Sequence, residues 1–334
     1  MKFDAILPPL PLARVSTLAE AAEAMGFDAL WSSETQHDPF LSLTLAAEHT
    51  SRLQLGTAVA IAFGRSPATV AYTAWDLAQL SGGRFILGLG TQVRAHIERR
   101  FGMTWPQSPV GKLREFVTAV RAFWRTWQEG EPLNVRGEYY RLSIMSPFFN
   151  PGPIDHPQIP IYLAGVNPGL CRLAGEIADG LHGHPFHSGR YLREVVRPSI
   201  EEGARRASRD PGEVCLAVSV FLVTSKEEAV FAREQIAFYA STPSYRRVMA
   251  LHGWEEAAET LSALARQGRW DEMASKVTDE MLETFAVVAP EAELPQAIED
   301  RYAGLADRIA PYIPFHPGER DDFWCRLVGA LRVP

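Results

Sequence analysis

The sequence has few cysteines and no excess of positive charge. Its 334 residues include three cysteines, Cys171, Cys215 and Cys325, which lie far apart and lack the spacing of a metal-binding motif. Scattered thiols in odd number indicate structural cysteines in a reducing compartment. Acidic residues outnumber basic ones by 40 to 33, which gives a net charge of −7. Because nucleic acids and anionic membranes bind basic surfaces, we expect neither as a partner.

Long apolar runs are also missing. No segment reaches the roughly 18 apolar residues that a membrane span requires. The residues after Met1 do not resemble a signal peptide, so we expect a cytoplasmic protein. Internal repeats and low-complexity segments are absent, and the composition, 46% apolar and 22% charged, is typical of a globular protein.

Short apolar segments alternate with helical patterns along the chain. In the first half they recur about every thirty residues, as in parallel strands joined by right-handed crossovers. A dinucleotide-binding fold is disfavoured because Gly88-Leu89-Gly90 lacks the third glycine of that motif. The pattern predicts an α/β fold, a (βα)8 TIM barrel forming one domain over residues 1–334. The predicted strands are 3–7, 27–31, 53–62, 85–89, 161–164, 180–183, 214–223 and 308–313.

Two insertions interrupt this rhythm. Residues 131–160 contain two β-prone runs around Gly137, which predicts a small hairpin. Between strands seven and eight, residues 226–283 are mostly helical and too long for one crossover, so an inserted helical lobe is predicted at about 241–283. A helix at 110–128 carries Trp124 and Trp127, which either pack into the core or face a second subunit in a homodimer.

Polar residues follow several predicted strands at their carboxyl ends, where barrel enzymes build their active sites. The segment after strand five opens a helix beside small residues, and free backbone amides at such a start can bind phosphate. The histidines at these exits lack carboxylates at metal-ligand spacing, so no metal site is expected, and a structural role stays open for each. The candidate residues are Glu34, His37, Thr91, His96, Gly165, Val166, Asn167, His182, Gly183 and His184.

Four segments together resemble a known family. DALWSSETQHDPF, LGTAVAIAFGRSP, GGRFILGLGTQVRAHIERRFGM and AGEIADGLHGHPFH are similar to the strand-exit motifs of the bacterial luciferase-like superfamily. The closest likeness is to its branch of oxidoreductases dependent on the deazaflavin coenzyme F420, and it extends over residues 3–315. The resemblance implies a barrel with an insertion and a flavin or deazaflavin across the carboxyl ends of the strands. It also implies hydride transfer at the central ring to or from a small-molecule substrate.

The resemblance also implies roles for particular residues. In relatives, the backbone at the end of strand three, often with a non-proline cis peptide, forms a bulge behind the ring; here this corresponds to Ala58, Val59 and Ala60. His96 matches a ring-contacting asparagine that follows strand four, after Thr91. The segment Gly165, Val166 and Asn167 resembles a phosphate cradle, with Gly183 and His184 beside it. Sugar-phosphate dehydrogenases of this branch carry a catalytic glutamate where this chain has Val93, which puts that activity in doubt.

A proton donor must therefore come from elsewhere. Glu34 and His37 are the candidates, because a carboxylate and an imidazole can each exchange a proton near neutral pH when the site tunes them. His37 is the first choice, and Glu34 either orients it or is held by Arg65 or Arg94. Three functions remain open: an F420-dependent oxidoreductase, a monooxygenase that uses reduced flavin mononucleotide (FMN) and oxygen, and a flavin-binding protein without turnover.

Overall fold

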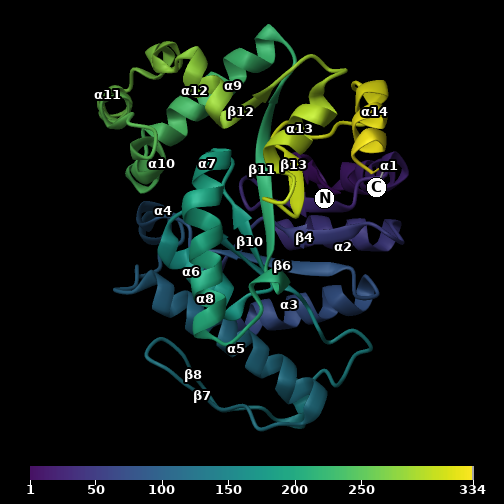
Figure 1. Cartoon of the computed structure of the whole chain (residues 1–334). Helices are drawn as coiled ribbons and strands as arrows, with labels where there is room; N and C mark the ends of the chain where they lie inside the picture. Colours follow the sequence, from purple (N-terminus) through teal and green to yellow (C-terminus); the bar gives the residue numbers. More distant parts are fainter. Residues whose placement is uncertain (333–334) are drawn as a thin grey trace.

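The computed structural model describes residues 1–332 and contains a closed parallel barrel (Figure 1). The sheet runs in the order β1-β13-β11-β10-β9-β6-β4-β3-β2. The first strand consists of β1 (Lys2–Phe3), which pairs with β13, and β2 (Ala5–Leu7), which pairs with β3, so the sheet closes on itself around Asp4. The predicted (βα)8 barrel is confirmed. Its other strands are β3 (Ala29–Ser32), β4 (Gln54–Thr57), β6 (Phe85–Gly90), β9 (Ile161–Gly165), β10 (Gly180–Gly183), β11 (Cys215–Val223) and β13 (Arg308–Pro311).

Helices cover the outside of the barrel and carry the chain from each strand to the next. Side chains cap several of them; Ser66, for example, accepts a hydrogen bond from the Ala68 amide at the start of α3. Gly26 ends α1 with a left-handed φ of 98°, a conformation that favours glycine. These helices are α1 (Val15–Met25), α2 (Pro39–His49), α3 (Pro67–Leu80), α4 (Arg94–Arg99), α5 (Pro109–Glu129), α6 (Pro168–Ile177), α7 (Gly189–Tyr191), α8 (Arg197–Arg206), α13 (Leu294–Tyr302) and α14 (Asp321–Leu331).

The third strand differs from its prediction. Residues 53–62 were expected to form one strand, but the structure divides them into β4 and the short β5 (Ala60–Ile61). The interruption is a non-proline cis peptide between Ala58 and Val59. An apolar run predicts a buried strand and carries no signal for a bulge within it.

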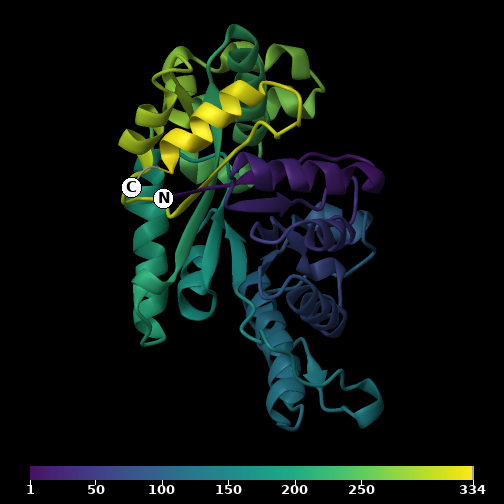
Figure 2. The same ribbon diagram turned by 90° about the vertical axis from the view of Figure 1, so that its right-hand side faces the viewer.

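The hairpin insertion lies beside α5. β7 (Val135–Arg136) and β8 (Arg141–Leu142) pair antiparallel, as predicted. Figure 2 shows α5 and this hairpin extending away from the barrel at the end opposite the lobe. Trp124 and Trp127 are only 5% and 2% exposed, and both pack near Trp75. The interpretation of these tryptophans as a subunit surface is therefore wrong, because α3 and α5 already bury them within one chain; a homodimer stays a prediction without that support.

The helical lobe stands between β11 and β13. Gly253 and Gly268 break it, with left-handed φ values of 76° and 72°. A short strand, β12 (Ala286–Val288), extends the sheet by pairing with the end of β11, and its three residues were not predicted as a strand. The lobe helices are α9 (Lys226–Ala240), α10 (Arg246–Ala250), α11 (Glu255–Arg266) and α12 (Asp279–Phe285). Within residues 1–332, no helix is both long enough and apolar enough to cross a membrane.

Candidate active site at the carboxyl ends of the strands

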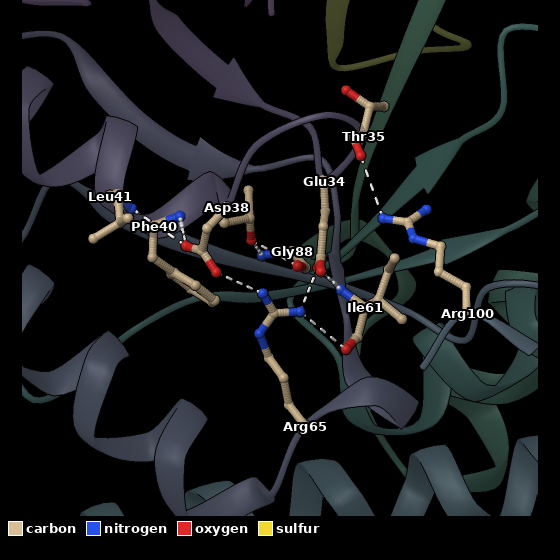
Figure 3. Close-up of polar contacts among 10 residues, drawn as sticks. Glu34, Thr35, Asp38, Phe40, Leu41, Ile61, Arg65, Gly88 and Arg100 are labelled. Atoms are coloured by element: carbon tan, nitrogen blue, oxygen red, sulfur yellow. Dashed lines mark hydrogen bonds and ion pairs between the residues drawn. The ribbon is translucent and has the colours of Figure 1, made fainter. Parts of the chain in front are cut away.

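An ion-paired cluster holds the loop that follows β3 (Figure 3). The Glu34 carboxylate accepts a hydrogen bond from the Ile61 amide at 2.7 Å and pairs with Arg65. The other guanidinium nitrogen of Arg65 donates to Asp38 at 2.7 Å, and Asp38 also caps α2. Burial by itself would lower the pKa of Arg65, but the two carboxylates raise it overall. Arg65 and Arg94 were the predicted partners of Glu34, and in the structure the partner is Arg65.

His37 lies in the same loop but is exposed. Within residues 1–332 neither of its ring nitrogens makes a hydrogen bond, and Glu34 is engaged with Ile61 and Arg65. The structure thus contradicts the idea that Glu34 orients His37. The role of His37 in proton transfer stays a prediction.

The cis peptide at the end of β4 is held by neighbouring strands. The Ala58 amide donates to the Ser32 carbonyl at 2.8 Å, and the Ser33 hydroxyl donates to the Ala58 carbonyl at 2.8 Å. A side chain on Gly90 could not fit, because its Cβ would lie 2.5 Å from a methyl group of Val59. Ala58 and Val59 are partly exposed and Ala60 is buried. The bulge that the family resemblance implied is therefore present at the barrel mouth.

Close approach of β4 and β6 supports this bulge. The Thr57 hydroxyl donates to the Gly88 carbonyl at 2.6 Å and accepts from the Gly88 amide at 2.9 Å. A Cβ on Gly88 would lie 1.7 Å from the Thr57 carbonyl oxygen, so only glycine fits. Thr57 was not among the predicted site residues, since a threonine inside a buried strand gives no functional signal.

The loop after β6 places Thr91 and His96 on the rim. Thr91 is partly buried, and its hydroxyl donates to the Gln92 carbonyl at 3.0 Å. Gln92 adopts a left-handed φ of 59°, which turns the chain into α4. His96 is exposed on that helix, and its ring makes no hydrogen bond to the described residues. Both side chains are accessible, as a ligand-binding role requires.

The β9 exit is a crowded turn tied to the lobe. Gly165 is buried, and a Cβ there would lie 3.0 Å from a Leu181 methyl group. The Val166 carbonyl accepts from the Tyr191 hydroxyl at 3.1 Å. The Asn167 side-chain amide donates to the Ser244 carbonyl of the lobe at 3.0 Å. These residues lie together at the strand end, as predicted.

Fewer free amides occur at the start of α6 than the sequence suggested. Pro168 has no N–H, and the amides of Leu170 and Cys171 both donate to the Asn167 carbonyl at 3.2 Å. Within the described chain, the Gly169 amide of this first helical turn has no backbone partner. The turn can therefore offer a phosphate one helix amide together with the backbone just before it.

Aromatic rings enclose His184 at the β10 exit. The imidazole stacks on Tyr245, with centroids 4.5 Å apart, and meets Tyr239 edge-on at 4.5 Å. Its Nδ1 accepts from the Phe186 amide at 3.1 Å, so the proton of the neutral ring is on Nε2. Burial lowers the pKa of His184 to about 3. Beside it, Gly183 is buried, and a side chain there would not fit because its Cβ would lie 2.9 Å from a Val218 methyl group.

Sequence reasoning missed three tyrosines near this exit. The hydroxyls of Tyr239 and Tyr312 lie 2.6 Å apart, and Tyr312 also donates to Gln235 at 3.2 Å. Tyr312 directly follows β13, so the rule that strand exits carry function could have found it. Tyr239 and Tyr245 belong to the lobe, where no sequence signal connected them to β10.

The predicted position of His182 is wrong. It was expected on the rim with His184, but it lies inside the barrel, where its ring meets Trp31 edge-on at 4.7 Å. It lines a cavity of about 40 Å³ that also reaches Ala58. A larger open groove of about 570 Å³ lies elsewhere, lined by residues such as Ser188, His252 and Arg301. None of the predicted site residues lines that groove, so the strand ends remain the candidate site.

The rim fits the ring of a flavin or deazaflavin. Ala58 and Val59 are partly exposed at the mouth, and β9 and β10 end at the glycines Gly165 and Gly183. His184 contributes a neutral ring with an N–H donor. A flat ring system needs such a surface of backbone and uncharged groups to lie against.

Within residues 1–332, no group of three or more His, Cys, Asp or Glu side chains could hold a metal ion.

The barrel, the lobe before its last strand and the cis peptide at the mouth are the features that the resemblance to the luciferase-like superfamily implied. The chain belongs to the luciferase-like monooxygenase family, whose model matches residues 4–308. An uncharacterized protein of Mycobacterium tuberculosis is 45% identical over 317 residues, 93% of each chain. A second protein of that organism, named a putative coenzyme F420-dependent oxidoreductase, is 32% identical over 301 residues, 81% of this chain and 82% of its own.

A solved structure shares the fold. The coenzyme F420-dependent tetrahydromethanopterin reductase from Methanopyrus kandleri superposes with a TM-score of 0.79 and 24% identity, covering 98% of this chain and 97% of its own. The likeness extends over the barrel and the insertions together.

Proposed function

We propose that the protein is a coenzyme F420-dependent oxidoreductase that transfers a hydride between the deazaflavin and a small organic substrate. The observation that carries the proposal is the 32% identity, over about four-fifths of both chains, to a protein named as F420-dependent. The accessible cis peptide at the barrel mouth supports it, since it matches the ring-backing bulge that the resemblance implied.

Backbone and small residues would hold the cofactor. Ala58, Val59 and Ala60 would lie behind the ring, with Thr91 and His96 on the neighbouring rim. Gly165, Val166 and Asn167, together with Gly183 and His184, would bind its phosphate. When bound, the deazaflavin supplies the hydride chemistry, and the protein orients the reactants and limits the access of water.

A proton must also move if the hydride goes to or from a carbon that bears oxygen. We assign this step to His37, whose exposed ring is free of protein partners in the described chain. Glu34 is assigned an anchoring role, because it binds Arg65 and the amide of Ile61, the last residue of β5.

Replacing His37 tests this assignment. His37→Ala should lower turnover by roughly 10²- to 10⁴-fold, the usual loss for a general acid or base, with little change in cofactor affinity. His49→Ala is the matched control, because His49 is also exposed but lies at the far end of α2. A large loss of cofactor affinity with normal turnover at saturation would instead assign His37 to binding.

The family description as monooxygenases favours one alternative, an FMN-dependent enzyme that uses oxygen. A deazaflavin has carbon in place of a ring nitrogen that the reaction of reduced flavin with oxygen requires, so the two cofactors predict opposite behaviour toward oxygen. Purified protein should therefore be titrated with each cofactor in its reduced form while ring absorbance and oxygen uptake are followed. We expect tight binding of F420 without oxygen uptake. Preferential binding of FMN with oxygen consumption would overturn the proposal, and binding without turnover on any small substrate would indicate a carrier.

A further inference from the structure

A small cavity lies inside the barrel directly beneath the cis peptide. Its volume is about 40 Å³. Polar side chains line it together with apolar ones, and the Ala58 residue of the cis peptide is part of its wall. The polar lining residues are Asp4, Ser33, His182, Ser219 and Arg308. The cavity therefore borders Ala58, whose backbone is proposed to lie behind the cofactor ring.

One polar atom in this interior stands out. The Nε2 of His182 is buried and has no hydrogen-bonding partner among the atoms of residues 1–332. A Cβ on Gly88 would lie only 3.1 Å from this nitrogen, so the glycine makes room for the ring. Because an unpaired buried polar group destabilises the folded state, such groups in native proteins nearly always have a partner.

The charges of the cavity wall already neutralise each other. The Arg308 guanidinium donates to both carboxylate oxygens of Asp4 at 2.8 Å, and the Trp31 indole donates to the same carboxylate at 2.8 Å. Burial by itself would lower the pKa of Arg308, but the Asp4 carboxylate raises it overall. Burial also lowers the pKa of His182 to about 3, so its ring is neutral. A guest of this cavity should therefore be small, uncharged and able to form hydrogen bonds.

Water meets these requirements. A cavity needs roughly 10–15 Å³ of such volume to hold one water, and a buried water typically makes two to four hydrogen bonds. His182, Ser33 and Ser219 supply that number of polar partners around the cavity. Ser33 already donates its hydroxyl proton to the Ala58 carbonyl, so its oxygen remains free to accept another.

We propose that the barrel interior holds a buried water bound to His182 Nε2, and that His182, acting through this water and Ser33, is a positioning residue for the Ala58 carbonyl. The water site is a property of the protein itself. Its consequence for the cofactor rests on the proposed function, because the Ala58 carbonyl is part of the ring-backing bulge.

The water site can be tested without a cofactor. A high-resolution crystal structure of the full chain should show an ordered water within hydrogen-bonding distance of His182 Nε2, in contact with Ser33 or Ser219. Nitrogen-15 spectra of histidine-labelled protein, assigned with His182→Gln, should show a neutral, hydrogen-bonded ring above pH 5. An interior without ordered water, or a water that does not reach Nε2, would overturn the proposal.

Variants test the positioning role. His182→Leu removes the hydrogen bond at similar volume, whereas His182→Gln can place an amide group near the position of Nε2. We expect the dissociation constant of F420 to rise about five- to tenfold in the leucine variant, corresponding to the loss of one hydrogen bond. The glutamine variant should return to within about twofold, a rescue that packing alone would not produce. Equal affinities in the two variants would contradict the positioning role.

If the His182→Leu variant does not fold, a serine variant and its matched control provide a second test. Ser33→Ala should weaken F420 binding to a similar degree and shift the nitrogen-15 signal of His182. Ser262→Ala is the control, because Ser262 also donates to a backbone carbonyl, that of Ser241 at 2.7 Å, but lies in the lobe. An unshifted His182 signal in Ser33→Ala would overturn the coupling. If the wild type bound no F420, the proposed function would fail, while the crystal and nitrogen-15 results would still decide the water site.

Discussion

The exits of β3 and β10 lie on the same barrel mouth but are stabilised in opposite ways. After β3, the Arg65 guanidinium bridges Glu34 and Asp38, and solvent reaches part of the cluster. After β10, burial keeps His184 and His187 uncharged, and aromatic rings from the lobe surround His184. The open exit after β3 is stabilised by paired charges, whereas the exit after β10, which the lobe covers, contains uncharged side chains. The difference arises because an ion must be paired or solvated, and the covered exit offers little water.

Acid should cause the largest change in the free energy of unfolding. The His187 Nδ1–H donates to the His184 carbonyl at 2.7 Å, and Nε2 lies 3.2 Å from the Tyr302 hydroxyl. Burial lowers the pKa of His187 to about 4, against about 6.5 in the unfolded chain. The contribution of neutral His187 to the free energy of unfolding is therefore complete above pH 6.5 and is lost as the pH falls toward 4. The free energy of unfolding should drop by about 1.4 kcal/mol per pH unit from this residue, or about 3 kcal/mol over the window.

Urea unfolding at pH 7, 5.5 and 4 measures this slope. His187→Gln should reduce the slope by the amount stated. Parallel slopes in wild type and His187→Gln would show that this histidine does not contribute to the acid sensitivity of the covered exit.

A smaller effect is expected on the open side. Glu34 is only 7% exposed, so Arg65→Ala would leave a nearly buried carboxylate without its counter-ion. We expect a loss of about 2 kcal/mol in the free energy of unfolding at pH 7. Arg94→Ala is the matched control, because its pair with Glu98 is exposed and should contribute less than about 0.5 kcal/mol. Similar losses in the two variants would mean that the open exit does not depend on its ion pair.

The smallest effect concerns the tyrosine pair that links the lobe to β13. Tyr312→Phe removes the hydrogen bond to the Tyr239 hydroxyl and should cost about 1 kcal/mol. Because burial raises the pKa of Tyr239, its hydroxyl keeps its proton, and the loss should be equal at pH 5 and pH 8. A loss that changed with pH would show that the covered exit contains a titrating group not accounted for by its histidines.

Local pattern determined much of the barrel in advance. Short apolar runs followed by polar loops located every barrel strand, because a strand buried on both faces must be apolar while its carboxyl end can be polar. The same rule located the exits that carry Glu34, Thr91, Gly165 and His184. Left-handed glycines such as Gly253 marked the breaks of the lobe, since few other residues adopt that conformation.

Only the tertiary structure decided which way the residues point and which distant segments meet. His182 and His184 are two residues apart, yet the first lies inside the barrel and the second packs against the lobe. From the sequence, Trp124 and Trp127 could pack into the core or face a second subunit. In the structure they are buried because α5 packs on α3. Tyr239 and Tyr245 reach His184 from more than fifty positions along the chain, and Arg65 rather than Arg94 reaches Glu34. A sequence specifies local periodicity and composition directly, whereas such contacts depend on closure of the barrel and on the path of the lobe across its mouth.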